Sequence, residues 1–300
     1  NDYGDGIKGT DNRSRLGPER TIQSGKITPK QMKLAIFVFS AFSFISGVYL
    51  IILSEITLFQ FAIFLSIGIL GVLLFMGSKQ DNKAGKERLW VVVVLFLFHS
   101  VFWALFEQAG GSITLFTART IDRVVLGSEI PASIFQFFNA FFIMTLAPVF
   151  SWMWIKIRNS GKEPSTPMKF VLGLSLLALG FAFIVLGSNF FAVEGLVPLV
   201  FLVFMYLFHT MGELSLSPVG LSMITKLSPK KAVGFVMGAW FLSIALANKM
   251  AGLIGELTAS EDLGENASRI ETLEVYSNTY LIWGVAVVGG AALVLLILVP

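Results

Sequence analysis

Long apolar runs alternate with short polar segments along most of this chain. A helix of about 20 apolar residues can cross the hydrocarbon core of a bilayer, which is about 30 Å thick. The runs lack the period-two alternation of transmembrane β-barrel strands, so we expect helices and an all-α membrane protein. The eight predicted spans are Leu34–Leu53, Leu58–Met76, Leu89–Ala109, Ile134–Ile155, Met168–Gly187, Leu196–Ser217, Ala232–Ile254 and Thr279–Val299.

The polar segments divide the chain into four parts. Residues 1–33 are polar and contain several glycines, and they lack the short apolar stretch and cleavage site of a signal peptide, so we expect a cytoplasmic linker. The first two spans are joined so tightly that residues 34–77 should form a transmembrane hairpin. Residues 78–88 are predicted to form a cytoplasmic loop that leads into a six-helix bundle over residues 89–300.

The composition places the chain in a membrane independently of the spans. Apolar residues make up 55% of the sequence, charged residues 14%, and the mean hydropathy is +0.78, which is too apolar for a soluble domain of this length. The absence of cysteine excludes disulfides and thiolate metal sites. Two histidines are too few for a histidine-rich metal centre.

Basic residues mark one side of the predicted bundle. Of the 22 Lys and Arg residues, 18 lie before the first span or after the second, fourth and sixth spans. Three lie in the opposite loops, beside acidic residues, and Lys249 lies within a span. Short cytoplasmic loops carry such an excess, so both termini of this multi-pass protein are predicted to be cytoplasmic. Because the basic residues do not form a single patch, we expect no nucleic-acid partner.

The sixth span carries a seam of polar residues. Tyr206, His209, Glu213 and Ser217 are spaced three, four and four residues apart and therefore share one helix face. Ionisable groups at membrane depth are costly and usually line an ion or substrate pathway. A cavity-lining role is therefore expected for Glu213. The alternative is that the histidine and the carboxylate bond each other or a neighbouring helix.

Two other spans carry polar residues at helical spacing. Trp103, Phe106 and Glu107 lie at i, i+3 and i+4, which places an aromatic wall beside a carboxyl group. Such shielding disfavours the charged form and suits a proton-exchanging group, although Glu107 could instead lie at the wet outer interface. Gln136 and Asn139 form an i, i+3 pair whose amides offer donors and acceptors to the two ends of a zwitterion.

The seventh span is expected to contribute mainly packing. Trp240, Ser243 and Ala247 share one face, and Lys249 points away from it, so we expect this lysine to snorkel or to pair with another helix. Small residues spaced for close helix approach add to this picture, and they are Gly234, Gly238, Gly252 and Gly255.

The sequence does not resemble that of an enzyme. It contains no Walker-type phosphate loop, no H-E-x-x-H helix and no G-x-S-x-G elbow. His209 and Glu213 supply only two ligands, whereas a catalytic zinc usually has three from the protein. We therefore expect neither catalysis nor a bound cofactor or metal.

Three strings resemble the proton-coupled oligopeptide transporters of the major facilitator superfamily. The most specific is HTMGELSLSPVGLSMITKLSPKKAVGFVMGAWFLSIALANKMAG (residues 209–252), which is similar to their tenth and eleventh helices. The seventh and eighth helices resemble VFWALFEQAG (101–110) and IFQFFNAFFIMTLAPVFSW (134–152). The chain departs from the family in having Ala140 where members usually have proline, and in lacking the first-helix motif E-x-x-E-R-F-x-Y-Y.

The resemblance implies a division of the fold. Residues 89–300 would be the C-terminal six-helix half of a major facilitator transporter, and residues 34–77 the extra hairpin that bacterial members insert between their two halves. The function implied is symport of di- and tripeptides with protons by alternating access in the bacterial inner membrane. The implied partners are the peptide, the proton, the lipid bilayer and an N-terminal six-helix half that these residues do not contain.

The same resemblance implies roles for individual residues. Glu107 would carry the coupling proton and, when ionised, pair with a basic residue of the first helix. Glu213 would bind the peptide amino terminus together with Asn139. The other implied substrate contacts are Trp103 and Phe106, which would shape a side-chain pocket, and Ser217 and Trp240, which would line the central cavity.

Two alternatives to peptide transport stay open. A transporter of the same fold could move another small solute, such as nitrate or an organic anion. A non-transporting membrane receptor or assembly subunit is the other possibility. Competition by di- and tripeptides against an acid-driven uptake signal would separate the first alternative, and ligand binding without uptake would indicate the second.

Overall fold

The computed structural model describes residues 28–52, 67–76, 83–229, 233–258 and 268–299. The chain divides into two units, Asn1–Phe61 and Ala62–Pro300. The described part of the first unit is the helix α2 (Pro29–Ile52), which overlaps the first predicted span. The predicted linker falls almost wholly outside the described residues.

Six helices of the second unit are long and apolar enough to cross a membrane, in agreement with the predicted bundle. These helices are Gly85–Gly110, Ala132–Asn159, Thr166–Phe190, Leu199–Leu227, Val233–Glu256 and Arg269–Leu298. The second predicted span overlaps a shorter apolar helix, Ile67–Met76. Since residues 53–66 and 77–82 lie outside the described part, the hairpin and the total of eight spans stay predictions.

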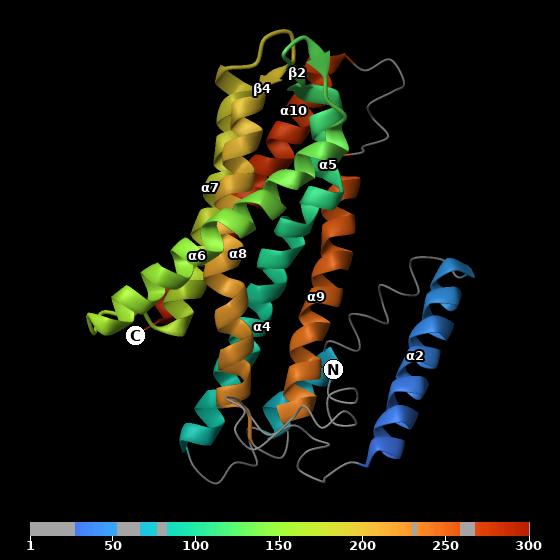
Figure 1. Ribbon diagram of the computed structural model, residues 1–300, viewed down its shortest axis with the longest axis vertical. Helices are drawn as coiled ribbons and strands as arrows, with labels where there is room; N and C mark the ends of the chain where they lie inside the picture. The colour runs from blue at the N-terminus through green and yellow to red at the C-terminus, as the bar shows by residue number, and fades with distance from the viewer. Residues whose placement is uncertain (1–27, 53–66, 77–82, 230–232, 259–267, 300) are drawn as a thin grey trace. The chain divides into compact units, whose positions relative to one another are not determined.

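Short elements extend or connect these helices (Figure 1). The first of these six helices, Gly85–Gly110, combines α4 (Lys83–Phe106) with the 3-10 turn η1 (Glu107–Gly110). The turn η2 (Ala132–Gln136) leads into α6 (Phe137–Asn159). The last span combines α10 (Arg269–Thr279), the π-helix η3 (Tyr280–Val287) and α11 (Val288–Leu298). The remaining helices are α5 (Ser112–Thr120), α7 (Thr166–Phe190), α8 (Leu199–Leu227) and α9 (Val233–Glu256).

Four short strands lie near one end of the bundle. β1 (Ile121–Asp122) pairs in parallel with β4 (Val197–Pro198), which joins the end of α5 to the start of α8. β2 (Val124–Val125) and β3 (Ser128–Glu129) form a hairpin. Residues 110–133, which lie between two predicted spans, therefore contain a helix and three strands. The prediction missed this structure because it searched for runs long enough to span a membrane.

The last span begins ten residues earlier than predicted, at Arg269 instead of Thr279. Ser268 caps it, because its side chain accepts a hydrogen bond from the Glu271 backbone while the Glu271 carboxylate accepts from the Ser268 backbone. This capping box fixes the start of a helix that is otherwise too polar for a hydropathy window to detect. The connection between the last two predicted spans is correspondingly shorter.

Prolines do not end the helices in which they occur. Pro218 lies inside α8, which continues to Leu227, so the predicted end of that span at Ser217 was wrong. Pro148 likewise lies inside α6, which continues to Asn159. Transmembrane helices tolerate proline where neighbouring groups satisfy the carbonyl that the missing N–H leaves free, which is that of Leu214 for Pro218.

The helix α7 is the most buried of the six described spans and packs most extensively against α8. The two helices cross closely where both lack a side chain. A Cβ added to Gly212 of α8 would lie 2.8 Å from the Gly173 carbonyl oxygen of α7. Further along α7, a Cβ added to Gly180 would lie 2.4 Å from the ring of His209. Glycine therefore sets the distance between these helices.

The glycines predicted to mediate close helix approach do not do so among the described residues. Cβ atoms added to Gly234, Gly238 or Gly252 of α9 would meet no atom of the described chain within 4 Å. At Gly255 the nearest such atom, the Gln108 side-chain oxygen, would be 4.0 Å away. Spacing alone identifies small residues on one face, and the packing of the fold decides which of those faces are covered.

Replacing Gly212 with alanine should therefore destabilise the bundle. The new methyl group would contact backbone, which cannot rotate away, and such overpacking costs about 1–3 kcal/mol. We expect a lower melting temperature in detergent than for the natural protein. Gly290→Ala in α11 is the matched control, because its Cβ would meet no described atom within 4 Å. Equal melting temperatures for the two variants would contradict this account of the helix crossing.

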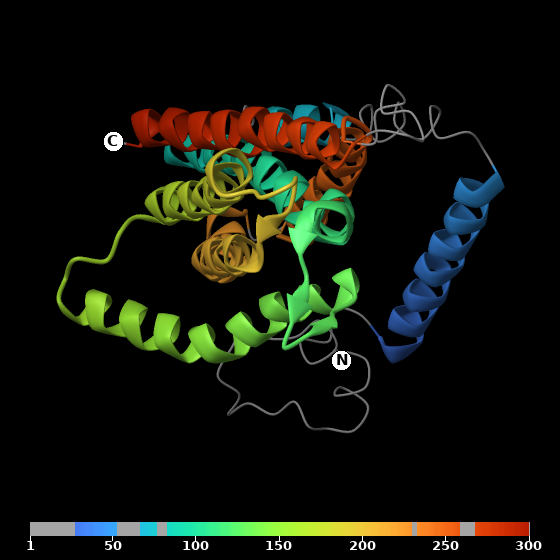
Figure 2. The same cartoon turned by 90° about the horizontal axis from the view of Figure 1, so that it is seen from above.

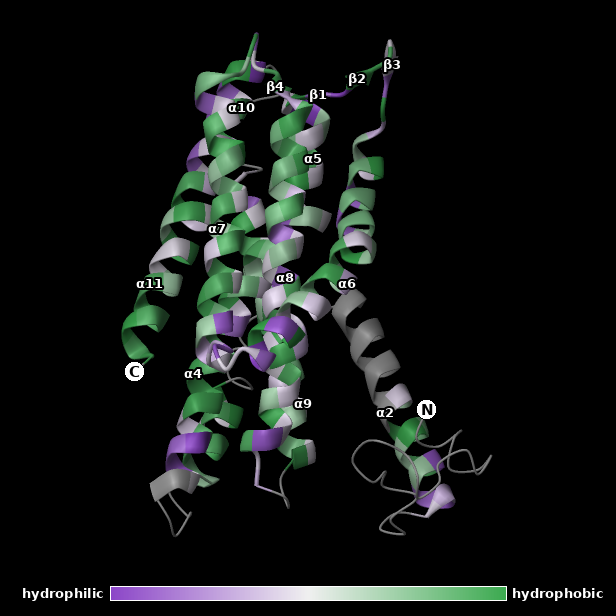
Figure 3. Ribbon diagram, turned by 60° about the vertical axis from the view of Figure 1, so that its left-hand side comes forward, coloured by the Kyte–Doolittle hydropathy of each residue, from purple (hydrophilic) through white to green (hydrophobic). Residues whose placement is uncertain are grey.

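The helix α6 lies at the edge of the bundle (Figure 2). Only 11% of the most apolar stretch of the span Ala132–Asn159 is buried, compared with 61% for the span formed by α7. Its main contact is α8. Hydrophobic residues dominate along α7 and α11 (Figure 3). The span that contains α6 is therefore the least buried of the six described spans.

Candidate functional site

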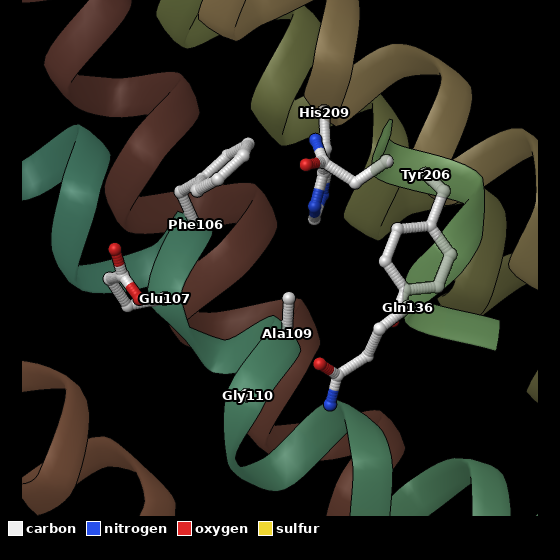
Figure 4. Close-up of a pocket in the computed structure, with 8 residues that line it drawn as sticks. Phe106, Glu107, Ala109, Gly110, Gln136, Tyr206 and His209 are labelled. Atoms are coloured by element: carbon white, nitrogen blue, oxygen red, sulfur yellow. The ribbon is translucent and has the colours of Figure 1, made fainter. Parts of the chain in front are cut away.

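A pocket of about 200 Å³ opens between α4, α6 and α8. Its lining comes from the end of α4 and η1, from the junction of η2 with α6, and from the middle of α8 (Figure 4). The lining residues are Phe106, Glu107, Ala109, Gly110, Gln136, Asn139, Tyr206 and His209. Six of these were predicted site residues, and they come together from three separate spans. Ala109 and Gly110 were missed, because small residues give no chemical signal.

Asn139 connects α6 to α8 at the pocket. Its side-chain nitrogen donates to the Glu213 carboxylate and to the Thr210 hydroxyl, both at 3.1 Å. The Thr210 hydroxyl in turn donates to the Tyr206 carbonyl at 2.7 Å. Glu213 does not line the pocket itself, but its carboxylate is hydrogen-bonded to Asn139, which does. Thr210 was missed by the sequence analysis, although it lies at i−3 from Glu213.

Glu107 lies where α4 tightens into the 3-10 turn, and its side chain is half-buried. Beside it, the rings of Trp103 and Phe106 meet edge-on, with centroids 5.2 Å apart and planes at 73°. The predicted arrangement of a carboxyl group next to two aromatic rings is therefore present. Phe106 lines the pocket, and Trp103 contacts the Phe106 ring without lining the pocket itself.

Gln136 fixes the opposite edge of the pocket. Its amide donates to the Thr114 hydroxyl at 2.8 Å, and that hydroxyl donates to the Ala109 carbonyl at 2.8 Å. The start of α6 is thereby tied to the turn that follows Glu107. Thr114 was also missed by the sequence analysis, because it lies between two predicted spans.

His209 is buried, and its ring packs on Phe181 with centroids 4.7 Å apart. It fits beside α7 because residue 180 is glycine. The Nε2 atom has no hydrogen-bond partner among the described residues. His209 lines the pocket, and the hydrogen bond to the Glu213 carboxylate comes from Asn139 instead.

Two further predicted residues lie away from this pocket. Trp240 is buried, with 3% of its surface exposed, and it packs between His99 and Phe170. Ser243 and Ala247 are buried on the same face of α9, as the spacing indicated. This packing separates Trp240 from the pocket. Ser217 is half-buried on α8, one turn beyond Glu213.

The described residues offer no obvious metal site, since no three His, Cys, Asp or Glu side chains among them cluster closely enough to hold an ion. The ligands available at the pocket are instead a carboxylate, two amides, a phenol and an imidazole. Such a set can bind the ammonium and the peptide groups of a small zwitterion.

A third acidic residue, Glu163, lies between α6 and α7 and joins their ends. It accepts hydrogen bonds from Arg158 at 2.9 Å and from Lys169 at 2.6 Å. The buried Lys169 ammonium also lies 4.6 Å from the centre of the Trp154 ring. The hydrogen bond from Arg158, followed by that from Lys169, lowers the pKa of Glu163 to about 2. This carboxylate therefore stays ionised at any pH at which a proton gradient could act.

The substitution Glu163→Gln should show the pH dependence that this lowered pKa requires. A depressed folded-state pKa stabilises the protein above the ordinary value of 4.5, and that contribution disappears as the pH falls towards 2. The variant should melt slightly lower than the natural protein at pH 7, because Arg158 is exposed, where ion pairs contribute little, and the glutamine oxygen can still accept a hydrogen bond from the buried Lys169. The difference in melting temperature should shrink between pH 4.5 and pH 2. A difference that stayed constant over this range would contradict the assignment.

Comparisons with known proteins agree on one family. The family model PTR2, described as the POT family, matches residues 19–270. Peptide transporter YePEPT of Yersinia enterocolitica subsp. palearctica is 36% identical over 247 residues, which cover 81% of this chain and 46% of that protein. Dipeptide and tripeptide permease B of Shigella dysenteriae is 33% identical over 230 residues, which cover 76% and 46%. The chain thus spans about half the length of the curated relatives it matches.

The fold matches solved structures over a similar share. The crystal structure of a mutant peptide transporter POT in complex with alafosfalin superimposes with a TM-score of 0.70 at 29% identity. The match covers 91% of this chain and 53% of that one. A POT family transporter in complex with 5-aminolevulinic acid gives a TM-score of 0.68 at 23% identity, which supports the fold alone. Sequence and fold together establish that this chain belongs to the POT family of membrane transporters.

Proposed function

We propose that the chain is the C-terminal half of a symporter that moves di- and tripeptides with protons by alternating access. The single observation that carries the proposal is the Glu213 carboxylate, which Asn139 holds at 3.1 Å beside a pocket that Glu107 also lines. Two carboxyl groups at one membrane-embedded site suit two tasks, one for the cargo and one for the proton.

The pocket supplies the chemistry that a short peptide requires. A peptide amino terminus is an ammonium, and a carboxylate held in place by an amide binds it through charge-assisted hydrogen bonds. The Gln136 amide and the Tyr206 hydroxyl offer further polar contacts, and Phe106 supplies an apolar wall. Every peptide shares the first of these features whatever its side chains, so recognition of the amine is compatible with a broad range of substrates.

The size of the pocket supports a site completed by a second half. Pockets for small ligands usually measure about 300–1,000 Å³, and this one measures about 200 Å³. Transporter sites lie between structural repeats, so residues of an N-terminal six-helix half would provide the remaining walls. The exposed length of α6 offers such a half an apolar surface.

Proton coupling is assigned to Glu107. When ionised, this carboxylate would pair with a basic residue of the N-terminal half and hold one gate closed. Protonation removes that attraction and shifts the equilibrium between the two open states. Glu107 lines the pocket one helical turn after Trp103, whereas Glu213 is hydrogen-bonded to Asn139. This separation supports different roles for the two carboxyl groups.

The location proposed is the bacterial inner membrane, with both termini in the cytoplasm. Two observations support it. Lys and Arg residues are concentrated on the side of the predicted bundle that carries the termini. The relatives named above are transporters of bacteria.

Uptake of a labelled dipeptide by proteoliposomes with an inward proton gradient tests the proposal. The transporter should be the complete protein, with both halves present. Excess unlabelled di- and tripeptides should compete, and dissipating the gradient should stop accumulation. Competition by nitrate or an organic anion, but not by peptides, would instead favour a different cargo. Peptide binding without uptake would favour a receptor.

A further inference from the structure

His99 has no role in the function proposed above, yet it occupies a central position on α4. Its side chain is buried, with 3% exposed, and it faces α9 one helical turn before Trp103. A buried histidine can serve simply as a satisfied packing residue. The arrangement of its two ring nitrogens indicates a more specific role.

Both nitrogens of His99 are hydrogen-bonded, and the partners determine which one carries the proton. The Trp103 indole nitrogen lies 2.8 Å from Nε2, and because an indole can only donate, Nε2 must accept. On the other side, Nδ1 lies 2.6 Å from the Ser243 hydroxyl. That hydroxyl already donates to the Trp240 carbonyl, so Nδ1 must be the donor. Two independent partners thus require the same neutral tautomer.

The tautomer makes the link directional. Ser243 and the α9 backbone fix the Nδ1 proton, which leaves Nε2 as an acceptor aimed at Trp103. The imidazole also lies against Trp240, with ring centroids 4.1 Å apart. The imidazole is therefore fixed by its contacts with α9, and it accepts a hydrogen bond from the Trp103 indole on α4. A protonated ring would place two donors face to face at Trp103, so the arrangement does not suit a proton carrier.

Trp103 needs this support because its own surroundings are incomplete. Its side chain is half-buried, whereas Trp240 is almost fully enclosed. The Trp103 ring meets Phe106 edge-on at 5.2 Å, and Phe106 lines the pocket. Because the two rings are in contact, a change in the orientation of the indole would reach the Phe106 ring at the pocket.

We propose that His99 is a positioning residue that fixes the Trp103 indole and thereby helps to select the peptide side chains that the site accepts. This inference rests on the proposed function. It differs from a packing role in one respect. A packing residue affects all substrates alike, whereas loss of an aromatic wall affects mainly those substrates whose side chains reach it.

The test compares transport kinetics in the complete protein for dialanine and for alanyl-phenylalanine. His99→Phe keeps a planar ring but removes the acceptor. We expect it to raise KM for alanyl-phenylalanine by about tenfold or more, the usual effect of a lost side-chain contact, with a much smaller change for dialanine and for kcat. His99→Gln should restore part of the preference, since its amide oxygen can accept from the indole.

Ser100→Ala is the matched control, because Ser100 is also buried on α4 and, among the described residues, its hydroxyl donates to the carbonyl of Phe96 on its own helix. It should leave the ratio of the two KM values unchanged. Ser243→Ala keeps the histidine and removes the group that orients it, so its ratio should fall between those of the natural protein and His99→Phe. This milder variant also serves if His99→Phe does not fold.

The outcomes separate this inference from the proposed function. Equal losses for both peptides, or no difference between the phenylalanine and glutamine variants, would overturn the role of His99 while peptide transport by the natural protein stands. Failure of the natural protein to transport either peptide would overturn the proposed function itself. A selective loss for alanyl-phenylalanine that glutamine partly reverses would support both.

Discussion

Substitution of Glu213 by alanine is expected to abolish uptake of peptides with a free amino terminus. In the natural protein the carboxylate is half-buried and held by Asn139, so it is pre-oriented towards a cationic group at the pocket. Removing one partner of a desolvated, hydrogen-bonded charge pair costs about 2–5 kcal/mol, which is roughly thirtyfold or more in affinity. Competition binding with a free dipeptide measures this loss.

The same substitution should hardly change the binding of an N-acetylated dipeptide, which carries no ammonium group. That contrast distinguishes a lost ion pair from a damaged fold. Glu274→Ala removes the same carboxylate from the exposed face of α10 and should leave both affinities unchanged. Equal weakening of the free and the acetylated peptide in Glu213→Ala would exclude the assigned contact.

Glu107→Gln should uncouple transport from the proton gradient. The amide keeps the shape of the side chain but can neither take up and release a proton nor form an ion pair. The equilibrium between the two open states of the transporter therefore no longer responds to pH through this residue. We expect the accumulation ratio of a labelled dipeptide to fall to about one, while exchange down its own gradient continues. Proteoliposomes measured with and without a pH difference give both quantities.

Exposed Glu274 again offers the matched control, here as Glu274→Gln, which should keep full accumulation. Persistent pumping by Glu107→Gln would assign coupling to another group. Loss of both accumulation and exchange would show that Glu107 is needed for binding or folding instead, because uncoupling alone leaves exchange intact.

Hydropathy was sufficient to predict the six-helix bundle, because a run of about 20 apolar residues has few stable alternatives in a bilayer. It was poor at helix ends, where short-range chemistry decides. The last span begins at Arg269 because of a capping box, and α8 continues past Pro218. Neither the capping box nor the continuation of a helix past proline can be recognised from the mean hydropathy of a stretch of sequence.

The candidate site was predictable in its charged and amide members but not in its geometry. Helical spacing put Tyr206, His209 and Glu213 on one face, yet the sequence alone could not show that Asn139 would bridge to Thr210 as well. Which glycines would bring helices together depended on pairing across the fold. Gly212 meets Gly173, which lies 39 residues away in the sequence.

The π-helix within the last span has a consequence for insertions and deletions. Its wider turns fit Gly284 against Phe181, and they also set the rotation of everything that follows. Val288, Ala292 and Leu295 of α11 are buried on one side. Deleting one residue from the π segment would turn that side by about 100°, the angle between neighbouring residues of an α-helix. Evolution should therefore tolerate many residue types in this segment more readily than any change in its length.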